Sequence, residues 1–376
     1  MKRRRFMAAG AATVGVAGLA LAGKAALDRG PTAATPASAS GTAGEFPRTL
    51  AESASPGSGP VRPDIRFDHV AVRLTEGAEP GARIGFTDES GDTSWQPVHF
   101  GEHARDDVAA APAAVVAVPE GTVGYEVRTD GADAAATAIN TRDGEGVPAS
   151  GPETGTLRAP ESTRAEGSGI RFLTRAGWGA DESLRFDEDG NDLWPAEFYP
   201  VQTITVHHTA MAVGDDPAAA VRAVYQLHAV EQAWGDIGYH LLIDPDGNVY
   251  EGRHSGEDDI PVFDGPPDGT GARPVTAGHV AGFNSGNIGI CLLGDFTEAL
   301  PAQAAQDSLV EVLSVLCAYT GVHPTDDVDY VNPVNDQTIT VQGISRHRDW
   351  LDTECPGNTF AENFDEVRDR VAAIIG

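Results

Sequence analysis

The sequence predicts a small all-β sandwich at residues 61–147, followed by an α/β domain at residues 169–376. In the first region, short apolar runs separated by Gly, Pro and Asp clusters are typical of antiparallel β-structure. The second region alternates β-branched runs with runs of helical period, as α/β domains do. The chain has 376 residues, of which 41% are hydrophobic, so both regions can bury a packed core.

The charge of the chain excludes nucleic acid as a partner. The net charge is -30 at pH 7, and such a chain repels nucleic acid and anionic membranes. Its three cysteines are too few for a disulfide framework, and at least one thiol stays unpaired. We expect a monomer in which that thiol is either a metal ligand or a buried residue.

Residues 1–40 are predicted to be an export signal. Three consecutive arginines precede the apolar run AAGAATVGVAGLALAG, and small residues follow it. The string RRRFM resembles the twin-arginine motif, which directs folded proteins across the membrane. The alternative is a membrane anchor, but Lys24 interrupts the apolar run before the roughly 20 residues that a span needs. We therefore expect a secreted protein with no stable membrane span, followed by a Ser, Ala, Gly and Pro-rich linker at residues 41–60.

The β-rich region is not expected to carry chemistry of its own. In HVAVRLT, Val70 and Val72 alternate with polar or small residues, which predicts a strand with one buried face. His69, His99 and His103 have no cysteine and no organised carboxylate partner. We therefore predict no catalytic set in this region.

The α/β domain follows a second polar linker, predicted at residues 148–168. Its first clear strand is VQTITVHH, residues 201–208. Alternate side chains of a strand point to opposite faces, so His208 shares the apolar face with Val206, and His207 lies on the other face. His207 is therefore the better candidate for a polar site, and His208 is expected to be packed or hydrogen-bonded.

A helix and a hairpin come next. Asp215 or Asp216 can cap the helix, and Pro217 suits its first turn. His228 lies on the apolar face of that helix, where it is either a core residue or a ligand. The runs GYHLLID and NVYEGR form a hairpin that turns at Pro245-Asp246-Gly247.

The remaining pattern predicts a long loop, two strands and two helices. Residues 254–276 form a long loop, which is either a lid or a species-specific insertion. A buried strand from Ile288 to Leu293 contains Cys291, and a helix from about Ala302 to Tyr319 turns Cys317 inward, so both cysteines are interpreted as core residues. QTITVQ then forms a strand, and FAENFDEVRDRVAAII forms a terminal helix.

The stretch SRHRDWLDTECPG, residues 345–357, holds a candidate ligand pair. His347 and Cys355 lie at loop distance, and histidine with cysteine can supply two ligands of a zinc site. The pair alone is weak evidence, because both residue types are also ordinary buried residues.

Five motifs together resemble a known family. TRAGWGADES, ITVHHTA, WGDIGYHLLIDPDGNVYEGR, GHVAGFNSGNIGICLLGDF, and RHRDW with TECPG occur in the order and spacing of peptidoglycan recognition proteins, which belong to the type 2 N-acetylmuramoyl-L-alanine amidases. The resemblance covers about 169–376 and implies a mixed central β-sheet flanked by helices. The β-rich region resembles the module that precedes this domain in actinobacterial members. Its role in this chain is either wall binding or spacing.

The resemblance also implies a zinc site and two catalytic partners. The Zn2+ ligands are His207, His347 and Cys355, and three protein ligands leave one position open, as in catalytic rather than structural zinc sites. Tyr239 matches the active-site tyrosine, which hydrogen-bonds the tetrahedral intermediate. Thr353 lies where some relatives carry lysine, and its hydroxyl can donate to the developing oxyanion.

Four further residues match positions that face the muropeptide in family members, namely His228, Trp234, His279 and Asn284. For Asn284 and His279, an ordinary turn or loop role is an equally good interpretation. We also expect the Asp349 carboxylate to orient His347.

The function implied is that of an exported zinc amidase, associated with the cell wall, that cleaves the lactyl–L-alanine amide of peptidoglycan. One alternative is a recognition protein that binds peptidoglycan without turnover. Another is a thiol hydrolase that uses Cys355 and His347. The thiol hydrolase is disfavoured because Pro356 follows the cysteine at once, where such enzymes place the thiolate at a helix N-terminus.

Overall fold

The computed structural model describes residues 44–54, 59–78, 81–101, 103–108, 111–160, 169–256, 260–266 and 271–376. All of them belong to one compact unit, Ala33–Gly376. The predicted export signal at residues 1–40 lies outside the described residues. Among those that are described, none of the helices combines the length and the apolar character that crossing a bilayer requires.

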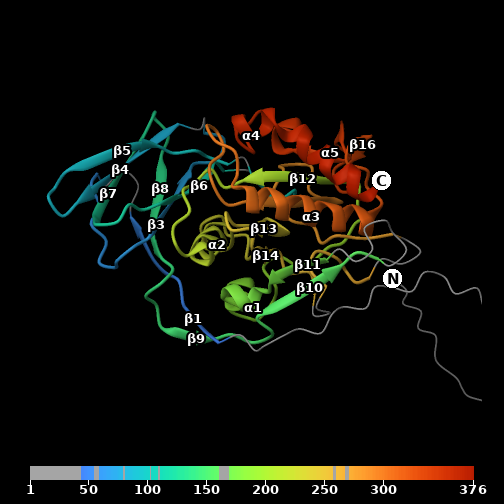
Figure 1. Ribbon diagram of the computed structural model, residues 1–376. Helices are drawn as coiled ribbons and strands as arrows, with labels where there is room; N and C mark the ends of the chain where they lie inside the picture. The colour runs from blue at the N-terminus through green and yellow to red at the C-terminus, as the bar shows by residue number, and fades with distance from the viewer. Residues whose placement is uncertain are drawn as a thin grey trace, which may run out of the picture. The chain divides into compact units, whose positions relative to one another are not determined.

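The N-terminal region is a sandwich of two antiparallel sheets, as predicted (Figure 1). One sheet has the strand order β2-β8-β3-β6, and the other has the order β5-β4-β7. Val70 and Val72 point between the sheets and pack with Ile84 and Phe86. The strands are β2 (Leu50–Ala54), β3 (His69–Leu74), β4 (Ala82–Asp88), β5 (Thr93–Pro97), β6 (Ala113–Ala117), β7 (Thr122–Thr129) and β8 (Ala134–Asn140).

The C-terminal domain is built on a seven-stranded mixed sheet with the order β10-β11-β14-β13-β15-β12-β18. The four strands from β13 to β18 in this order are parallel to one another. The predicted hairpin is confirmed as the antiparallel pair β13–β14. The strands are β10 (Thr154–Arg158), β11 (Gly169–Leu173), β12 (Thr203–His208), β13 (Leu241–Ile243), β14 (Val249–Glu251), β15 (Asn287–Leu292) and β18 (Ile344–Arg346).

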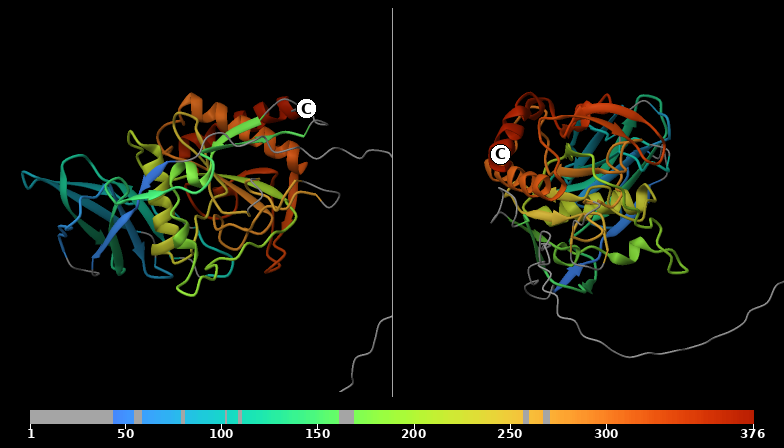
Figure 2. Two further views of the ribbon diagram at one scale, coloured as in Figure 1. Left: turned by 90° about the horizontal axis from the view of Figure 1, so that it is seen from below. Right: turned by 90° about the vertical axis from the view of Figure 1, so that its right-hand side faces the viewer.

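Helices cover both faces of this sheet (Figures 1 and 2). Val206 faces a core shared with α3 (Gln303–Thr320) and α5 (Phe364–Ile375). The opposite face, which includes Cys291, packs against α2 (Pro217–Gln226). Asp216 caps α2 and Pro217 begins it, as predicted. The smaller elements are α1 (Arg175–Trp178), α4 (Asn358–Glu362), the π-helical turn Leu227–Glu231, the 3-10 turns Glu182–Arg185 and His347–Asp349, and the paired strands β1 (Glu45–Pro47) with β9 (Gly146–Pro148) and β16 (Asp327–Val331) with β17 (Thr338–Gln342).

Both predicted linkers are wrong in part. Residues 41–60 contain β1 and β2, and β2 pairs with β8 at the edge of a sandwich sheet. Residues 148–168 contain β10, which pairs with β11 at the edge of the main sheet. The strands LAESA and TGTLR are small and polar, so their composition resembles a linker, although their backbones complete the sheets.

Two more predicted elements differ from the structure. The terminal helix is divided into α4 and α5 at Asn363, whose side chain donates to the Thr359 carbonyl oxygen at 2.8 Å and competes with helical bonding. In the loop predicted as a lid or an insertion, Val262 and Phe263 are fully buried in the main core. The described part of that loop is therefore packed structure.

The sandwich and the C-terminal domain share a hydrophobic core. Ala71 and Val115, on the face of the sandwich sheet opposite Val70, pack in the same cluster as Val221 and Val224 of α2. Thr137 donates a hydrogen bond to Glu231 at 2.8 Å across this contact. The sandwich is therefore held against α2, which brings the segment between β5 and β6 near the end of β12.

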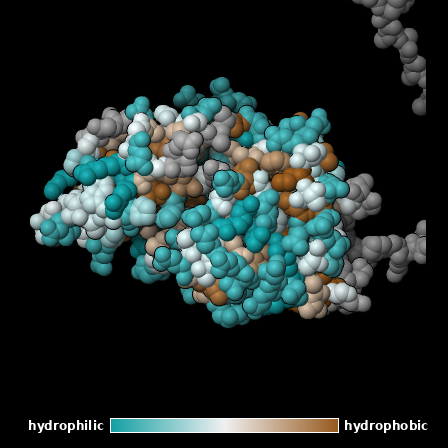
Figure 3. Space-filling view, turned by 90° about the horizontal axis from the view of Figure 1, so that it is seen from above, coloured by the Kyte–Doolittle hydropathy of each residue, from teal (hydrophilic) through white to brown (hydrophobic). Residues whose placement is uncertain are grey.

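Hydrophilic residues dominate the surface seen from above in Figure 3, with small separate hydrophobic areas between them. This distribution agrees with the net charge of -30. Polar and charged side chains cover most of this face, as the composition predicts.

A buried ion network stabilises the C-terminal domain. The Asp236 carboxylate is fully buried and lies 2.9 Å from Arg175 Nη1 and 2.8 Å from Arg253 Nη1. Burial raises the pKa of Asp236, but the charges of Arg175 and Arg253 outweigh burial and lower it to about 2. The carboxylate therefore stays ionised down to acid pH.

We expect Asp236→Asn to lower the free energy of unfolding by about 3–5 kcal/mol, because it removes the carboxylate that two buried guanidinium groups share and leaves Arg175 with Glu182 alone. The folded pKa lies below the unfolded value of about 3.9, so this contribution is complete above about pH 4 and is lost as the pH falls toward 2. Denaturant unfolding at pH 7 and pH 3 measures both effects. The control Asp215→Asn removes an exposed pair with Arg142 and should cost less than about 1 kcal/mol. Equal losses in the two variants would contradict this account.

Candidate active site and metal centre

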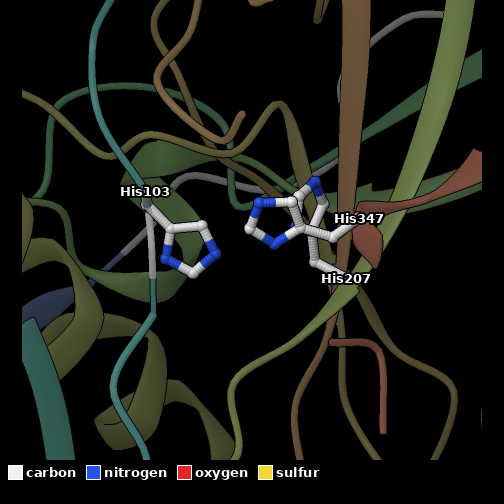
Figure 4. Close-up of side chains that lie close together, drawn as sticks. All are labelled: His103, His207 and His347. Atoms are coloured by element: carbon white, nitrogen blue, oxygen red, sulfur yellow. The ribbon is translucent and has the colours of Figure 1, made fainter. Parts of the chain in front are cut away.

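Three imidazole rings meet where β12 and β18 end (Figure 4). His207 lies in β12, and His347 begins the turn directly after β18. Their ring centroids are 4.6 Å apart. His103 comes from the sandwich segment between β5 and β6, and its ring stacks on His347 at 5.1 Å. The candidate ligand nitrogens of all three residues lie within 4.8 Å of one another.

His347 has a bonding deficit that a metal ion would satisfy. Its side chain is fully buried, and neither ring nitrogen has a hydrogen-bond partner among the described residues. A buried polar atom without a partner costs about 1–3 kcal/mol. Burial lowers the pKa of His347 well below its ordinary value, and nearby histidines add to the effect, so the ring is neutral. A neutral imidazole is the form that binds metal ions.

A chain of hydrogen bonds orients His207. The Asn287 carbonyl oxygen lies 3.1 Å from His279 Nε2, which must donate to it. His279 Nδ1 is then an acceptor, and His207 Nε2 donates to it at 3.0 Å. This assignment leaves the lone pair of His207 Nδ1 pointing into the histidine cluster, as metal-binding histidines with a fixed tautomer do.

Cys355 lies beside this nitrogen. Its Sγ is 3.8 Å from His207 Nδ1 and accepts a hydrogen bond from the His208 backbone N–H at 3.4 Å. Two ligands of a tetrahedral zinc ion lie roughly 3.4–3.7 Å apart, so the distance fits a shared metal. Burial raises the pKa of Cys355 to about 12, and a bound cation would reverse that effect. The group of mutually close ligand atoms consists of His103 and the two predicted histidines. Cys355 is not part of this group, and its Sγ lies close to His207.

The predicted catalytic partners also lie at this place. Tyr239 directly precedes the hairpin, and its hydroxyl is 3.1 Å from His103 Nε2. Thr353 Oγ1 accepts a hydrogen bond from the Cys355 backbone N–H at 3.3 Å. Both residues line a cavity of about 280 Å³ together with His228 and Cys355. This volume lies at the lower limit for small-molecule pockets, which span about 300–1,000 Å³.

The predicted muropeptide-facing residues are only partly brought into this cavity. His228 lines it, accepts a hydrogen bond from the Gly238 N–H at 3.0 Å and stacks on Trp234 at 4.8 Å. Trp234, His279 and Asn284 are buried and do not line it. The interpretation of His279 as a substrate contact is corrected, because its ring nitrogens bond His207 and Asn287 from behind.

Two other expectations are also corrected. Asp349 does not contact the His347 ring; it accepts hydrogen bonds from the Arg346 backbone N–H at 2.8 Å and from the Arg346 guanidinium, which fixes the turn that presents His347. His208 behaves as predicted, since its Nδ1 accepts from the Phe296 N–H at 3.3 Å. The sandwich does contribute to the site, through His103. No sequence spacing signals this contribution, because 104 positions separate His103 from His207.

Residues 197–358 match the model of the family Amidase_2, described as N-acetylmuramoyl-L-alanine amidase. The C-terminal domain belongs to the family of peptidoglycan recognition proteins and type 2 N-acetylmuramoyl-L-alanine amidases. This amidase-family domain places its buried histidines at the carboxyl ends of parallel strands, where open α/β sheets commonly form their sites.

The relatives of the amidase-family domain include both enzymes and recognition proteins. The chain is 29% identical to human N-acetylmuramoyl-L-alanine amidase over 174 residues, which are 45% of this chain and 24% of the human protein. It is 26% identical to Drosophila melanogaster peptidoglycan-recognition protein LB over 197 residues, which are 51% of this chain and 67% of that protein. The solved structure of Drosophila PGRP-LB has 27% identity and a TM-score of 0.36, covering 51% of this chain and 92% of the other. The match thus spans about a quarter of the human amidase and two thirds of the fly protein.

Proposed function

We propose that the C-terminal domain is a zinc-dependent N-acetylmuramoyl-L-alanine amidase that hydrolyses the lactyl–L-alanine amide bond of peptidoglycan. The observation that carries the proposal is the fully buried His347, whose two ring nitrogens are both unpartnered among the described residues. Its ring lies 4.6 Å from that of His207, whose Nδ1 is 3.8 Å from Cys355 Sγ. This donor set matches the zinc chemistry of hydrolases. The amidase-family match supports the choice of bond.

The residues present fit zinc. His207, His347 and Cys355 would hold the ion, with the His207 tautomer fixed by His279. When bound, zinc supplies a Lewis acid that polarises the scissile carbonyl and makes water nucleophilic near neutral pH. Thiolate and neutral imidazole are ligands that zinc prefers.

The chain's own residues have separate roles in this reaction. Burial raises the pKa of the Tyr239 hydroxyl, so it stays protonated and can donate to the oxyanion that develops on the carbonyl. Thr353, on the cavity wall beside Cys355, is a second donor. His228 and the neighbouring wall residues would contact the muropeptide.

The competing functions have less support. The pKa of Cys355, raised by burial to about 12, does not suit a thiol nucleophile. Recognition without turnover would not require the buried cysteine, whereas the proposed ligand set of His207, His347 and Cys355 uses it. We further propose that the protein is exported through its twin-arginine-like signal and acts as a monomer on cell-wall peptidoglycan.

Product analysis tests the proposed function. Zinc-loaded protein incubated with muropeptides should release peptides with a free L-alanine amine, chelator should stop the release, and zinc should restore it. If the intact chain and the variants His103→Ala and Asp106→Asn all leave muropeptides intact over long incubation, the enzyme assignment fails.

Replacement of His279 tests the support of the metal site. We expect His279→Ala to weaken zinc binding about 10- to 100-fold, because His207 loses the acceptor that fixes its tautomer. Competition with a chromophoric chelator measures the zinc dissociation constant. The control His323→Ala removes a half-exposed histidine paired with Asp326 and should leave zinc binding unchanged. Unchanged zinc binding in His279→Ala would contradict the proposed orientation of His207.

A further inference from the structure

We propose that the sandwich supplies a fourth metal ligand, His103, and that residues 103–108, here called the strap, fill the substrate cleft. The chain then folds as a latent amidase. The latency rests on the proposed function, whereas the fourth ligand rests on the histidine geometry alone.

His103, from the sandwich, lies beside the two predicted histidine ligands of the C-terminal domain. Its ring stacks on His347 at 5.1 Å and meets the His207 ring edge-on at 5.6 Å. One of its nitrogens lies within 4.8 Å of the ligand atoms of both (Figure 4). These three histidines form the group of mutually close ligand atoms, and Cys355 Sγ lies 3.8 Å from His207 Nδ1, so together they are the proposed set of four ligands. Four protein ligands are typical of closed zinc sites, whereas catalytic sites keep one position open.

Asp106 anchors the strap on the residue expected to bind substrate. Its carboxylate accepts hydrogen bonds from Asn284 Nδ2 at 2.6 Å, Ser285 Oγ at 3.2 Å and Asn332 Nδ2 at 2.9 Å. The Asn284 backbone N–H also donates to it, at 3.2 Å. Hydrogen bonds to an ionised carboxylate are the stronger kind. Asn284 Nδ2 also donates to the Ala104 carbonyl oxygen at 2.9 Å, so the strap takes up its free donors.

Arg105 covers the aromatic part of the same surface. Its guanidinium lies 4.5 Å from the centre of the Trp194 ring and donates to the Trp234 carbonyl oxygen at 3.2 Å. Trp194 packs edge-on against Trp234 at 6.1 Å. The strap therefore contributes to the burial of Trp234 and Asn284.

The strap and a muropeptide would compete for the same groups. Tyr239, the proposed oxyanion donor, is hydrogen-bonded to His103. Asn284 is hydrogen-bonded to the strap backbone and to Asp106. Because the strap is tethered, it binds as an intramolecular ligand at high effective concentration. The apparent affinity for substrate is then the affinity of the open state multiplied by the fraction of molecules that are open. Displacement of the strap would open one metal position and the cleft together.

Zinc binding provides a test that does not depend on activity. We expect His103→Ala to weaken zinc binding at least about tenfold, because one of four ligands is lost. In the cobalt-substituted protein, the visible absorption should change from that of a four-protein-ligand site to that of a site open to water and added anions. His323→Ala is the control for loss of a histidine outside the cluster.

Turnover of muropeptides at saturating zinc tests latency. We expect His103→Ala and Asp106→Asn each to raise kcat/KM at least about tenfold, because both shift molecules to the open state. In Asp106→Asn, an amide NH2 group replaces one carboxylate oxygen and faces the donors of Asn284, Ser285 and Asn332, so the strap loses hydrogen bonds. The matched control Asp307→Asn changes a largely exposed carboxylate that pairs with Arg370 outside the strap and should alter kcat/KM by less than about twofold. Thermal unfolding verifies that each variant is folded.

The outcomes separate the two proposals. If no variant hydrolyses muropeptides but His103→Ala still weakens zinc binding, the fourth ligand stands and the amidase assignment falls. If the intact chain hydrolyses muropeptides and His103→Ala changes neither zinc binding nor the cobalt spectrum, the fourth ligand is refuted. A loss of turnover in His103→Ala with unchanged zinc binding would make His103 a catalytic residue and would also refute the strap.

Discussion

Cys355→Ser should release muropeptide products at least about 100-fold more slowly than the parent protein, because a serine hydroxyl is a poor zinc ligand and the site loses its thiolate. The structure gives the thiolate no other evident task, since Sγ lies between His207 Nδ1 and the His208 backbone N–H. Product release is measured in the intact chain and in the Asp106→Asn background, where the cleft is open.

The matched control for this variant is Cys317→Ala. Cys317 lies on the buried face of α3, and burial raises its pKa to about 12, so it is an inert thiol. Its replacement should reduce stability slightly and leave turnover unchanged. If Cys355→Ser retains turnover within a few-fold of the parent, the zinc amidase mechanism is wrong.

Tyr239→Phe should lower kcat about 100-fold with little change in KM, because one oxyanion donor is lost while the cavity shape is kept. Zinc content should not fall, since phenylalanine keeps the ring that packs against His207 at 5.5 Å and loses only the hydroxyl bonded to His103. Steady-state kinetics in the Asp106→Asn background separates kcat from KM.

Tyr199→Phe is the control for this prediction, because its hydroxyl contacts Glu197 away from the cavity. A kcat of Tyr239→Phe close to that of the parent would remove the tyrosine from the reaction. A fall in zinc content instead would indicate that it supports the metal site.

The sequence predicts the interior of the fold better than its edges. Alternation along HVAVRLT and VQTITVHH identifies the buried faces because burial imposes a period of two on a strand. The edge strands β2 and β10 escape this logic, since backbone pairing holds them and their side chains are small or polar. The alternation along HVAVRLT predicts only one buried face, but the other face is buried too, because its small apolar residues Ala71 and Val115 pack against α2.

The site was predictable where the ordered motifs reach. His207 and His347 lie side by side, Cys355 approaches His207, and Tyr239 and Thr353 line the neighbouring cavity, while their roles stay predictions. His279 and Asp349 were assigned to the wrong neighbours, because a motif specifies which residues recur and not which atoms they touch. His103 was missed because its position depends on the packing of two regions, which no local pattern encodes.

Mass spectrometry of muropeptide products, with zinc-loaded and chelator-treated protein side by side, tests the central claim most directly. We predict that the zinc-loaded Asp106→Asn protein adds one water across the lactyl–L-alanine bond and that the chelated protein does not until zinc is returned. Equal cleavage in both samples, or cleavage at another bond, would contradict the assignment of a zinc-dependent N-acetylmuramoyl-L-alanine amidase.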